Sequence, residues 1–214
     1  MAGKVIYKGG EGEITEKKSR FIATVRSVHS EDEAAAFITE MKKKYWDARH
    51  NCSAYILGQR QEIQRFSDDG EPQGTAGKPM LDVLAGAGLH DCAVVVTRYF
   101  GGILLGTGGL VRAYSKAVQE GLKNSIVIEK LRGRKIIIET DYNGVGKLQY
   151  LLGQRDIPVV DAQYSDVVKT MVLVEEEKAD ELLAAVTEAT NGKALWEEEK
   201  GISFAFVEKQ PVLF

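Results

Sequence analysis

The spacing of apolar residues near the start of the chain predicts a strand followed by an amphipathic helix. Residues 14–28 mix β-branched and charged side chains, which is typical of a strand or of a hairpin arm that starts before them. Ser30 and Glu33 have the spacing of a capping box at a helix N-terminus. Apolar residues then recur at helical spacing, at Ala34, Phe37, Ile38 and Met41. The lysines at 42–44 suit the negative end of that helix.

The next apolar runs are short and are separated by turn residues. Residues 51–57 and 62–66 predict two strands of a hairpin joined across residues 58–61. A glycine-rich loop follows and ends at Pro79. Because proline suits the first position of a helix, a short helix is predicted over residues 80–87.

A buried strand and a longer helix are predicted next. Residues 92–97, with the sequence CAVVVT, form a continuous apolar run between polar residues, as a strand buried on both faces does. A helix is predicted over residues 106–122, with one apolar face made of Leu110, Tyr114, Ala117, Val118 and Leu122.

The second part of the chain predicts a different arrangement, with a boundary around residues 128–134. Strands are expected over 135–140, 158–163, 167–174 and 202–207, and helices over 145–152 and 178–189. The order β-α-β-β-α-β is that of the ferredoxin-like fold, with four antiparallel strands under two helices. The strand over 202–207 is expected to be the last.

Composition places the chain among soluble globular proteins. Of its 214 residues, 44% are apolar and 28% are charged. No stretch has the ~18–20 uninterrupted apolar residues that a membrane-spanning helix needs, and the start of the chain lacks the apolar run of a secretory signal. Cys52 and Cys92 are too few for a disulfide framework and suit a reducing compartment. We therefore expect a cytoplasmic protein.

Charge is unevenly distributed along the chain. The net charge of −3 argues against a protein that coats DNA, and no preference for DNA is predicted. Residues 1–130 carry 18 basic and 16 acidic side chains, a balance of +2, whereas residues 131–214 carry 10 and 15, a balance of −5. Two domains with different surfaces explain this difference, and an anionic partner of the first half would explain it as well.

Residues 65–112 hold an unusual density of glycine. Ten of the 22 glycines lie there, in three segments that also contain charged or hydroxyl side chains. Glycine is selected where the backbone needs a positive φ or where another group approaches it closely. The pattern is typical of a surface that receives a ligand. Tight packing of helices against a sheet is the structural alternative.

Known phosphate-binding motifs do not match this stretch. A P-loop needs Ser or Thr where Pro79 stands, and the Rossmann fingerprint needs glycine where Val111 stands. An anion site is still expected at residues 106–109, because they open a helix whose first N–H groups are free. Lys78, Arg98 and Arg112 are expected to converge on it. The alternative for Arg98 is an ion pair with Asp68 or Asp69.

Three loop carboxylates, Asp68, Asp69 and Glu71, admit two interpretations. They could bind Mg²⁺ or supply a general base. Aspartates beside glycine also accept hydrogen bonds from their own backbone in turns, and this interpretation is favoured here. His50 and Cys52 share one face of a predicted strand, but two ligands do not make a zinc site, so packing is expected and no metal is predicted.

Two long motifs in this stretch, RFSDDGEPQGTAGKP and VVVTRYFGGILLGTGGLVRAYS, resemble the signature of the Impact/YigZ family, uncharacterised protein family 0029. The segments SRFIATV and HNCSAYIL fit the same family. The resemblance covers essentially the whole chain and is to the bacterial two-domain type. It is specific, because many unusual residues recur in a fixed order.

The resemblance implies an α+β chain of two domains. Residues 1–130 are expected to form an Impact-type domain with the fold of ribosomal protein S5 domain 2. Residues 131–214 are expected to form a ferredoxin-like domain that resembles the C-terminal domain of elongation factor G. Eukaryotic Impact members look like regulators of translation, acting by protein–protein competition, but they join the first domain to a different partner domain. The bacterial two-domain members have no established reaction.

The leading hypothesis is a translation-associated, regulatory binding protein that contacts RNA, the ribosome or a translation-linked protein, without a cofactor or a catalytic residue. Basic side chains would contact phosphates, and aromatic side chains would offer a stacking or apolar surface. Glycines would let the backbone of the ligand come close to the protein backbone. The candidate ligand-binding residues are Arg65, Lys78, Arg98, Tyr99, Phe100, Gly101, Gly102, Gly106, Thr107, Gly108, Gly109 and Arg112. The alternatives are a protein-interaction module and an enzyme acting on a small phosphorylated or carboxylated metabolite, with Asp68 or Asp69 as base or metal ligand.

Overall fold

A computed structural model describes residues 3–207 and 210–214 of the chain. These residues divide into two compact units, one of residues 3–128 and one that contains the described residues from 129 onward. Both units combine sheets with helices, and the chain has five helices in the part that the structure describes.

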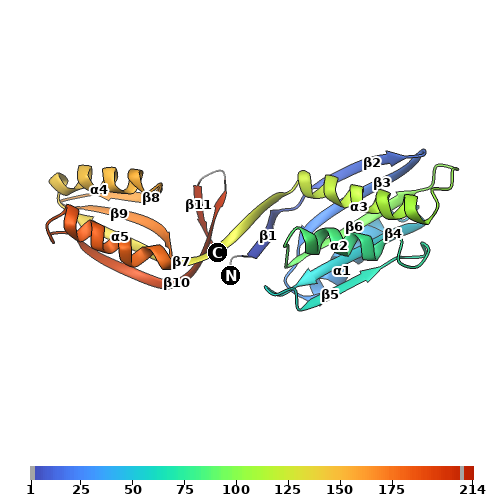
Figure 1. Ribbon diagram of the computed structural model, residues 1–214, viewed down its shortest axis with the longest axis horizontal. Coiled ribbons are helices and arrows are strands. Elements are labelled where there is room, and N and C mark those ends of the chain that lie inside the picture. Colours follow the sequence, from blue (N-terminus) through green and yellow to red (C-terminus); the bar gives the residue numbers. More distant parts are fainter. Residues whose placement is uncertain (1–2, 208–209) are drawn as a thin grey trace. The chain divides into compact units, whose positions relative to one another are not determined.

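The first unit is a five-stranded antiparallel sheet with three helices (Figure 1). The order of strands in the sheet is β2-β3-β6-β4-β5. Its elements are β1 Gly3–Lys8, β2 Glu11–Glu16, β3 Ser19–Ser27, α1 Glu31–Lys44, β4 His50–Leu57, β5 Ile63–Ser67, α2 Gly77–Gly86, β6 Cys92–Tyr99 and α3 Thr107–Lys123.

Strand β6 lies at the centre of this sheet and is buried on both faces, as predicted. Val94 and Val96 belong to a core with α2 and α3, whereas Ala93 and Val95 belong to a second core with α1. Alternate side chains of a strand point to opposite faces. The continuous apolar run of β6 therefore reflects helices on both sides of the sheet.

Helix α1 begins where the capping pattern predicts. The Oγ of Ser30 accepts a hydrogen bond from the N–H of Glu33 at 3.1 Å. The Glu33 carboxylate accepts one from the N–H of His29 at 2.7 Å. The buried residues of this helix are Ala34, Phe37 and Met41, and all three belong to the predicted apolar stripe.

Three predictions for the first unit need correction. The stretch over 14–28 is two strands, because Lys17 and Lys18 both adopt positive φ and turn β2 back along β3. Helix α2 begins at Gly77, before Pro79, because the Asp68 carboxylate accepts hydrogen bonds from the N–H groups of Ala76 and Gly77. The short strand β1 was not predicted.

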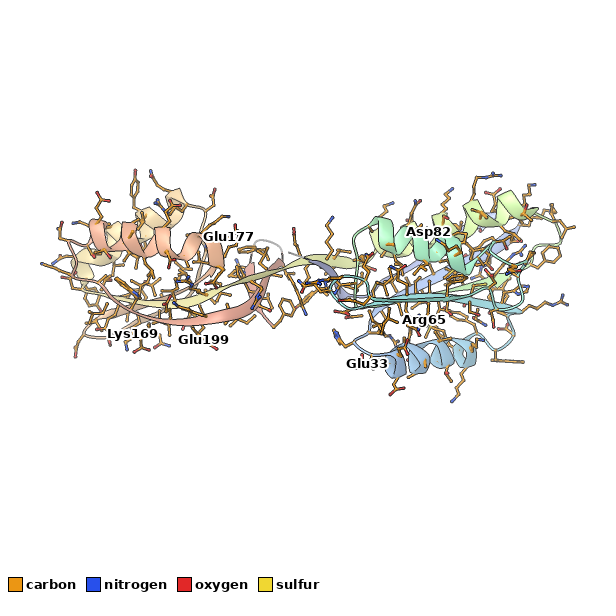
Figure 2. The ribbon with its side chains drawn as sticks, turned by 60° about the horizontal axis from the view of Figure 1, so that its bottom comes forward. Glu33, Arg65, Asp82, Lys169, Glu177 and Glu199 are labelled. Carbon is orange, nitrogen blue, oxygen red and sulfur yellow. The ribbon has the colours of Figure 1, made fainter. Side chains whose placement is uncertain are left out.

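The second unit has the predicted order of strands and helices. Its elements are β7 Ile126–Thr140, α4 Tyr142–Gln154, β8 Val159–Tyr164, β9 Val168–Glu175, α5 Glu176–Ala189, β10 Leu195–Val207 and β11 Gln210–Leu213. The sheet order is β11-β10-β7-β9-β8, with antiparallel neighbours. Both helices cover one face, whereas Lys169 and Glu199 lie on the other (Figure 2).

The second core follows from strand alternation, and two strand limits differ from the prediction. Ile136 and Ile138 of β7 face the helices and pack with Leu148 and Leu182. Strands β7 and β10 are longer than expected, since they begin at Ile126 and Leu195. The prediction that residues 202–207 are the last strand was wrong, because β11 follows and pairs with the end of β10.

None of the helices in the described residues is long and apolar enough to cross a membrane.

Candidate functional site

The register of the first sheet brings the glycine-rich segments to one end of it. His50 at the start of β4 lies opposite Arg98 near the end of β6, and Arg20 at the start of β3 lies opposite Tyr99. Strand β5 ends at Ser67, opposite Ser53. The loops over residues 68–76 and 100–106 therefore leave the sheet at the same end, which we call the loop end.

Asp68 organises the first loop. Its Oδ1 accepts hydrogen bonds from the N–H groups of Ala76 at 3.0 Å and Gly77 at 2.8 Å, and its Oδ2 accepts one from Gly74 at 2.8 Å. The carboxylate thus satisfies backbone donors at the start of α2 that have no intrahelical partner. The Asp68 carboxylate therefore accepts three backbone hydrogen bonds, which hold the loop against the start of α2.

Asp69 is also engaged within the unit. Its Oδ1 accepts a hydrogen bond from Lys42 Nζ at 2.6 Å, and its Oδ2 accepts one from the N–H of Asn51 at 2.7 Å. His50 Nδ1 lies 2.9 Å from the carbonyl oxygen of Asp69, and Cys52 Sγ donates to the carbonyl of Asp68 at 3.0 Å. His50 and Cys52 therefore fasten the loop to β4. Among the described residues, no three His, Cys, Asp or Glu side chains group as metal ligands.

Glu71 and Arg98 form a buried ion pair beneath the loops. Arg98 Nη1 donates to Glu71 Oε1 at 2.6 Å, and both side chains are less than 10% exposed, at 7% and 4%. Tyr114 of α3 donates its hydroxyl to the same Oε1 at 2.8 Å. Arg98 Nη2 also donates to Ser19 Oγ at 3.4 Å. The alternative for Arg98, an ion pair with Asp68 or Asp69, is therefore corrected to an ion pair with Glu71.

The environment of this pair keeps its neighbours uncharged. Burial, reinforced by Cys52 and Glu71, raises the pKa of Tyr114 far above its usual range. Burial also raises the pKa of the Cys52 thiol to about 12, although the hydrogen bond with Tyr114 opposes this change. Cys52 is therefore a protonated core residue that links β4 to α3.

Lys78 and Arg65 do not join Arg98. Lys78 is exposed and pairs with Asp82, one turn further along α2. The Arg65 guanidinium lies 3.8 Å from the carboxylate of Glu31, on the first turn of α1. Figure 2 shows Arg65 on the α1 side of the sheet and Asp82 on the other side. Arg65 faces α1 because alternate residues of β5 point to opposite faces of the sheet, whereas Lys78 lies on α2, and neither pairs with the carboxylate that holds Arg98.

Tyr99 and Phe100 have different environments. The Tyr99 hydroxyl donates to Asp47 Oδ1 at 2.8 Å, and this hydrogen bond raises the pKa of Tyr99. Phe100 is 51% exposed, and the Arg98 guanidinium carbon lies 5.6 Å from its ring centroid. Ile103 and Leu104, in the same loop, are 43% and 82% exposed. The loop after β6 therefore presents apolar side chains to solvent.

The glycines of this loop serve two local purposes. The N–H of Gly101 donates to Ser19 Oγ at 3.1 Å, and a Cβ at this position would overlap the backbone of Lys18. Gly102 and Gly106 have positive φ, at 85° and 73°. Gly106 precedes the exposed Thr107, which begins α3 without a side-chain cap.

Arg112 is exposed and lies beside the start of α3. A Cβ added at Gly108 would lie 3.6 Å from its Nη1, whereas one at Gly109 would lie 3.0 Å from Leu105 Cβ. Arg112 therefore lies close to the first turn of α3. Its role in binding stays a prediction.

Sequence reasoning missed three cations at the loop end, Lys17, Lys18 and Arg49. The two lysines form the turn between β2 and β3, and Arg49 directly precedes His50. In residues 3–207 and 210–214, these cations and Arg112 take part in no ion pair. The sequence offered no clear signal for this turn, because two-residue hairpin turns are usually marked by glycine or asparagine and Lys17 and Lys18 are neither.

Two family models match the chain, one in each unit. A model of the Impact N-terminal domain matches residues 17–122, and one of a domain of unknown function, DUF1949, matches residues 138–193. The IMPACT family member YvyE of Bacillus subtilis is 46% identical over 189 residues, 88% of this chain and 87% of that protein. The chain belongs to the Impact family.

Two further Impact relatives and one solved structure are similar to one or both units. YigZ of Escherichia coli is 38% identical over 178 residues, which cover 82% of this chain and 87% of YigZ. A Protein IMPACT homolog of Dictyostelium discoideum is 41% identical over 105 residues, but these cover 47% of this chain and 29% of that protein. A crystal structure of a hypothetical protein is 34% identical, with a TM-score of 0.58, and covers 91% of this chain and 96% of that one.

Proposed function

We propose that this Impact-family chain is a cytoplasmic, translation-associated regulatory protein that binds RNA or the ribosome through the loop end of its first unit. The family resemblance implies translation as the setting. We further propose that the two units are domains of residues 1–130 and 131–214, with the folds of ribosomal protein S5 domain 2 and of the elongation factor G C-terminal domain. The strand order β10-β7-β9-β8 supports the second assignment.

One observation carries the proposal: unpaired cations gather at the loop end beside an exposed aromatic ring. Lys17, Lys18, Arg49 and Arg112 have no carboxylate partner among the described residues, whereas Lys78, Arg65 and Arg98 each have one. Phe100 presents a ring for base stacking. Phosphate contacts give affinity and stacked aromatic side chains hold unpaired bases, so this set suits RNA.

Within this proposal, Arg98 acts as a support rather than as a phosphate contact. It is buried, its charge is balanced by Glu71, and its guanidinium lies against Phe21 and Phe100. It thereby holds the strand end from which Phe100 projects. The phosphate-binding role expected for Arg98 passes to Arg112 and to the turn lysines.

The test is RNA binding by the purified full chain, measured by fluorescence anisotropy with ribosomal RNA fragments across a salt series. Arg112→Ala and the double change Lys17→Ala with Lys18→Ala are each expected to weaken binding by about threefold to thirtyfold and to reduce the salt slope. Arg65→Ala is the matched control, since Arg65 faces α1, and it should leave affinity unchanged. Equal effects of Arg65→Ala and Arg112→Ala, or no binding at low salt, would refute the proposal.

Protein recognition is a second candidate, favoured by the exposed side chains of Ile103 and Leu104. Aliphatic side chains do not stack with bases, so they suit an apolar pocket on a partner protein better than RNA. A partner that survives nuclease treatment and is lost in Leu104→Asp would support this function. For the enzyme hypothesis no comparable feature exists in the described residues, because Asp68 and Asp69 are both held by hydrogen bonds within the first unit.

A further inference from the structure

The second unit contains a small polar cavity where the N-terminus of α4 meets the turn after α5. The cavity has a volume of about 120 Å³, which is room for several water molecules or one phosphate-sized oxyanion. It is lined by Thr140, Asp141, Asn143, Gly144, Lys147, Thr190, Asn191, Lys193 and Ala194.

The first turn of α4 supplies free hydrogen-bond donors to this cavity. Asp141 caps the helix, accepting the N–H of Gly144 with its Oδ1 at 2.7 Å. In the described part of the chain, the N–H groups of Tyr142 and Asn143 have no acceptor. The helix dipole adds positive potential at the same place, so this end of α4 favours an anion.

A buried hydroxyl in the cavity wall has no partner. Thr140 is 4% exposed, and its Oγ1 makes no hydrogen bond within the described residues. Thr140 lines the cavity and packs against the first turn of α4, since a Cβ added at Gly144 would lie 3.1 Å from Thr140 Cβ and 3.5 Å from its Cγ2 methyl. Thr190, in the same wall, donates its hydroxyl to the carbonyl of Val186 at 2.8 Å. A buried hydroxyl without a hydrogen-bond partner is destabilising, and a ligand that bonds to it would remove that cost.

The charges around the cavity also favour an anion. Lys147 and Lys193 line it, and neither forms an ion pair with any residue that the structure describes. Asp141 is the acidic residue of the lining, and its carboxylate is already engaged with Gly144. Two cations against one carboxylate leave the cavity with a net positive charge.

We propose that this cavity binds a phosphate group, held by the N–H groups of Tyr142 and Asn143, the Thr140 hydroxyl, Lys147 and Lys193. The ligand class is a phosphate monoester or inorganic phosphate, and a terminal phosphate of RNA is an alternative source of the same chemistry. The site lies in the second unit and does not rest on RNA binding at the loop end.

Nuclear magnetic resonance of the full ¹⁵N-labelled chain, titrated with inorganic phosphate at constant ionic strength, tests the site. The amide signals of Tyr142 and Asn143 are expected to shift in a saturable way. Lys147→Gln and Lys193→Gln should each weaken the affinity by about threefold to tenfold. Lys116→Gln, an exposed lysine of the first unit, should have no effect. Absence of saturation, or equal effects of all three changes, overturns the proposal.

Thr140→Val separates binding from folding, because it keeps the side-chain shape and removes the unpaired hydroxyl. The fold should be retained and phosphate affinity should fall. Unchanged affinity in this variant would exclude Thr140 from the site and contradict the proposal.

Three competitors of inorganic phosphate then identify the source of the ligand. If glycerol phosphate competes and RNA with a 5′-hydroxyl does not, the site binds small phosphate monoesters. If 5′-phosphorylated RNA also competes, the site accepts the terminal phosphate of RNA. If neither glycerol phosphate nor 5′-phosphorylated RNA competes, the proposal is overturned.

Discussion

At the scale of single residues, the buried Glu71–Arg98 pair decides how the loop end is built. A buried ion pair is stable only if both charges keep their partners, because removing one leaves the other uncompensated. Glu71 also accepts the Tyr114 hydroxyl, so it joins the first loop, β6 and α3 at one oxygen atom. The pair therefore fixes the position of the loops from which the candidate binding residues project.

We expect Glu71→Ala to destabilise the chain by about 3–5 kcal/mol, measured by urea unfolding followed by circular dichroism. The reason is that Arg98 would remain buried without a counter-charge. Glu13→Ala is the control, because Glu13 pairs with Arg20 in solvent and should contribute less than about 1 kcal/mol.

The double variant Glu71→Leu with Arg98→Met sharpens this test. It replaces both charges with apolar side chains of similar size, so it should recover most of the loss caused by Glu71→Ala. A Glu71→Ala variant that is as stable as Glu13→Ala would contradict a structural role for the pair.

At the scale of elements, the loop between β5 and α2 depends on one carboxylate. Asp68 accepts three backbone hydrogen bonds, two of them at the start of α2. We expect Asp68→Ala to destabilise the chain by about 2–3 kcal/mol in the same measurement, because a charged acceptor is lost from a helix N-terminus. Asp68→Asn should have a smaller effect, since it keeps one oxygen.

Asp82→Ala is the control for Asp68. It removes an exposed carboxylate from the same helix and breaks its ion pair with Lys78, a pair worth about 0.3–0.5 kcal/mol. If the two alanine variants had equal stability, Asp68 would not be the residue that positions the loop.

Local patterns predicted most elements because their determinants lie within a few residues. The Ser30–Glu33 cap, the apolar stripe of α3 and the doubly buried β6 are examples. The start of α2 was misplaced because its cap, Asp68, lies nine residues before Gly77. The turn at Lys17 and Lys18 was missed because the strand residues on both sides of it form one continuous pattern.

The candidate site was harder to predict, because its electrostatics depend on contacts between distant segments. The loop end did gather the glycine-rich segments. Yet Arg98 is paired with Glu71, which lies 27 residues earlier, and Arg65 turns toward α1. Which cations stay unpaired is decided by strand register and side-chain direction, and neither is visible in composition or motif spacing.

At the scale of the whole molecule, the two units have separate cores with different titrating groups. Cys52 and Cys92 both belong to the core of the first unit. Burial raises the pKa of each thiol from 9.0 to about 12. Above pH 9 the unfolded chain releases these protons while the folded unit retains them, so the unfolded state binds fewer protons and stability falls as the pH rises toward 12.

We therefore expect calorimetry to show the unfolding transition of the first unit moving to lower temperature between pH 8 and pH 10.5. Each thiol should contribute about 2 kcal/mol to the loss by the upper pH, since one proton corresponds to about 1.4 kcal/mol per pH unit. Cys92→Ala should lose less stability over this range than the unmodified chain, although it starts from a lower value because a cavity is left in the core. The transition of the second unit, which has no cysteine, should be the same in both proteins at each pH. If the unfolding temperature of the first unit fell equally with pH in Cys92→Ala and in the unmodified chain, the buried Cys92 thiol would not be a cause of the loss of stability at high pH.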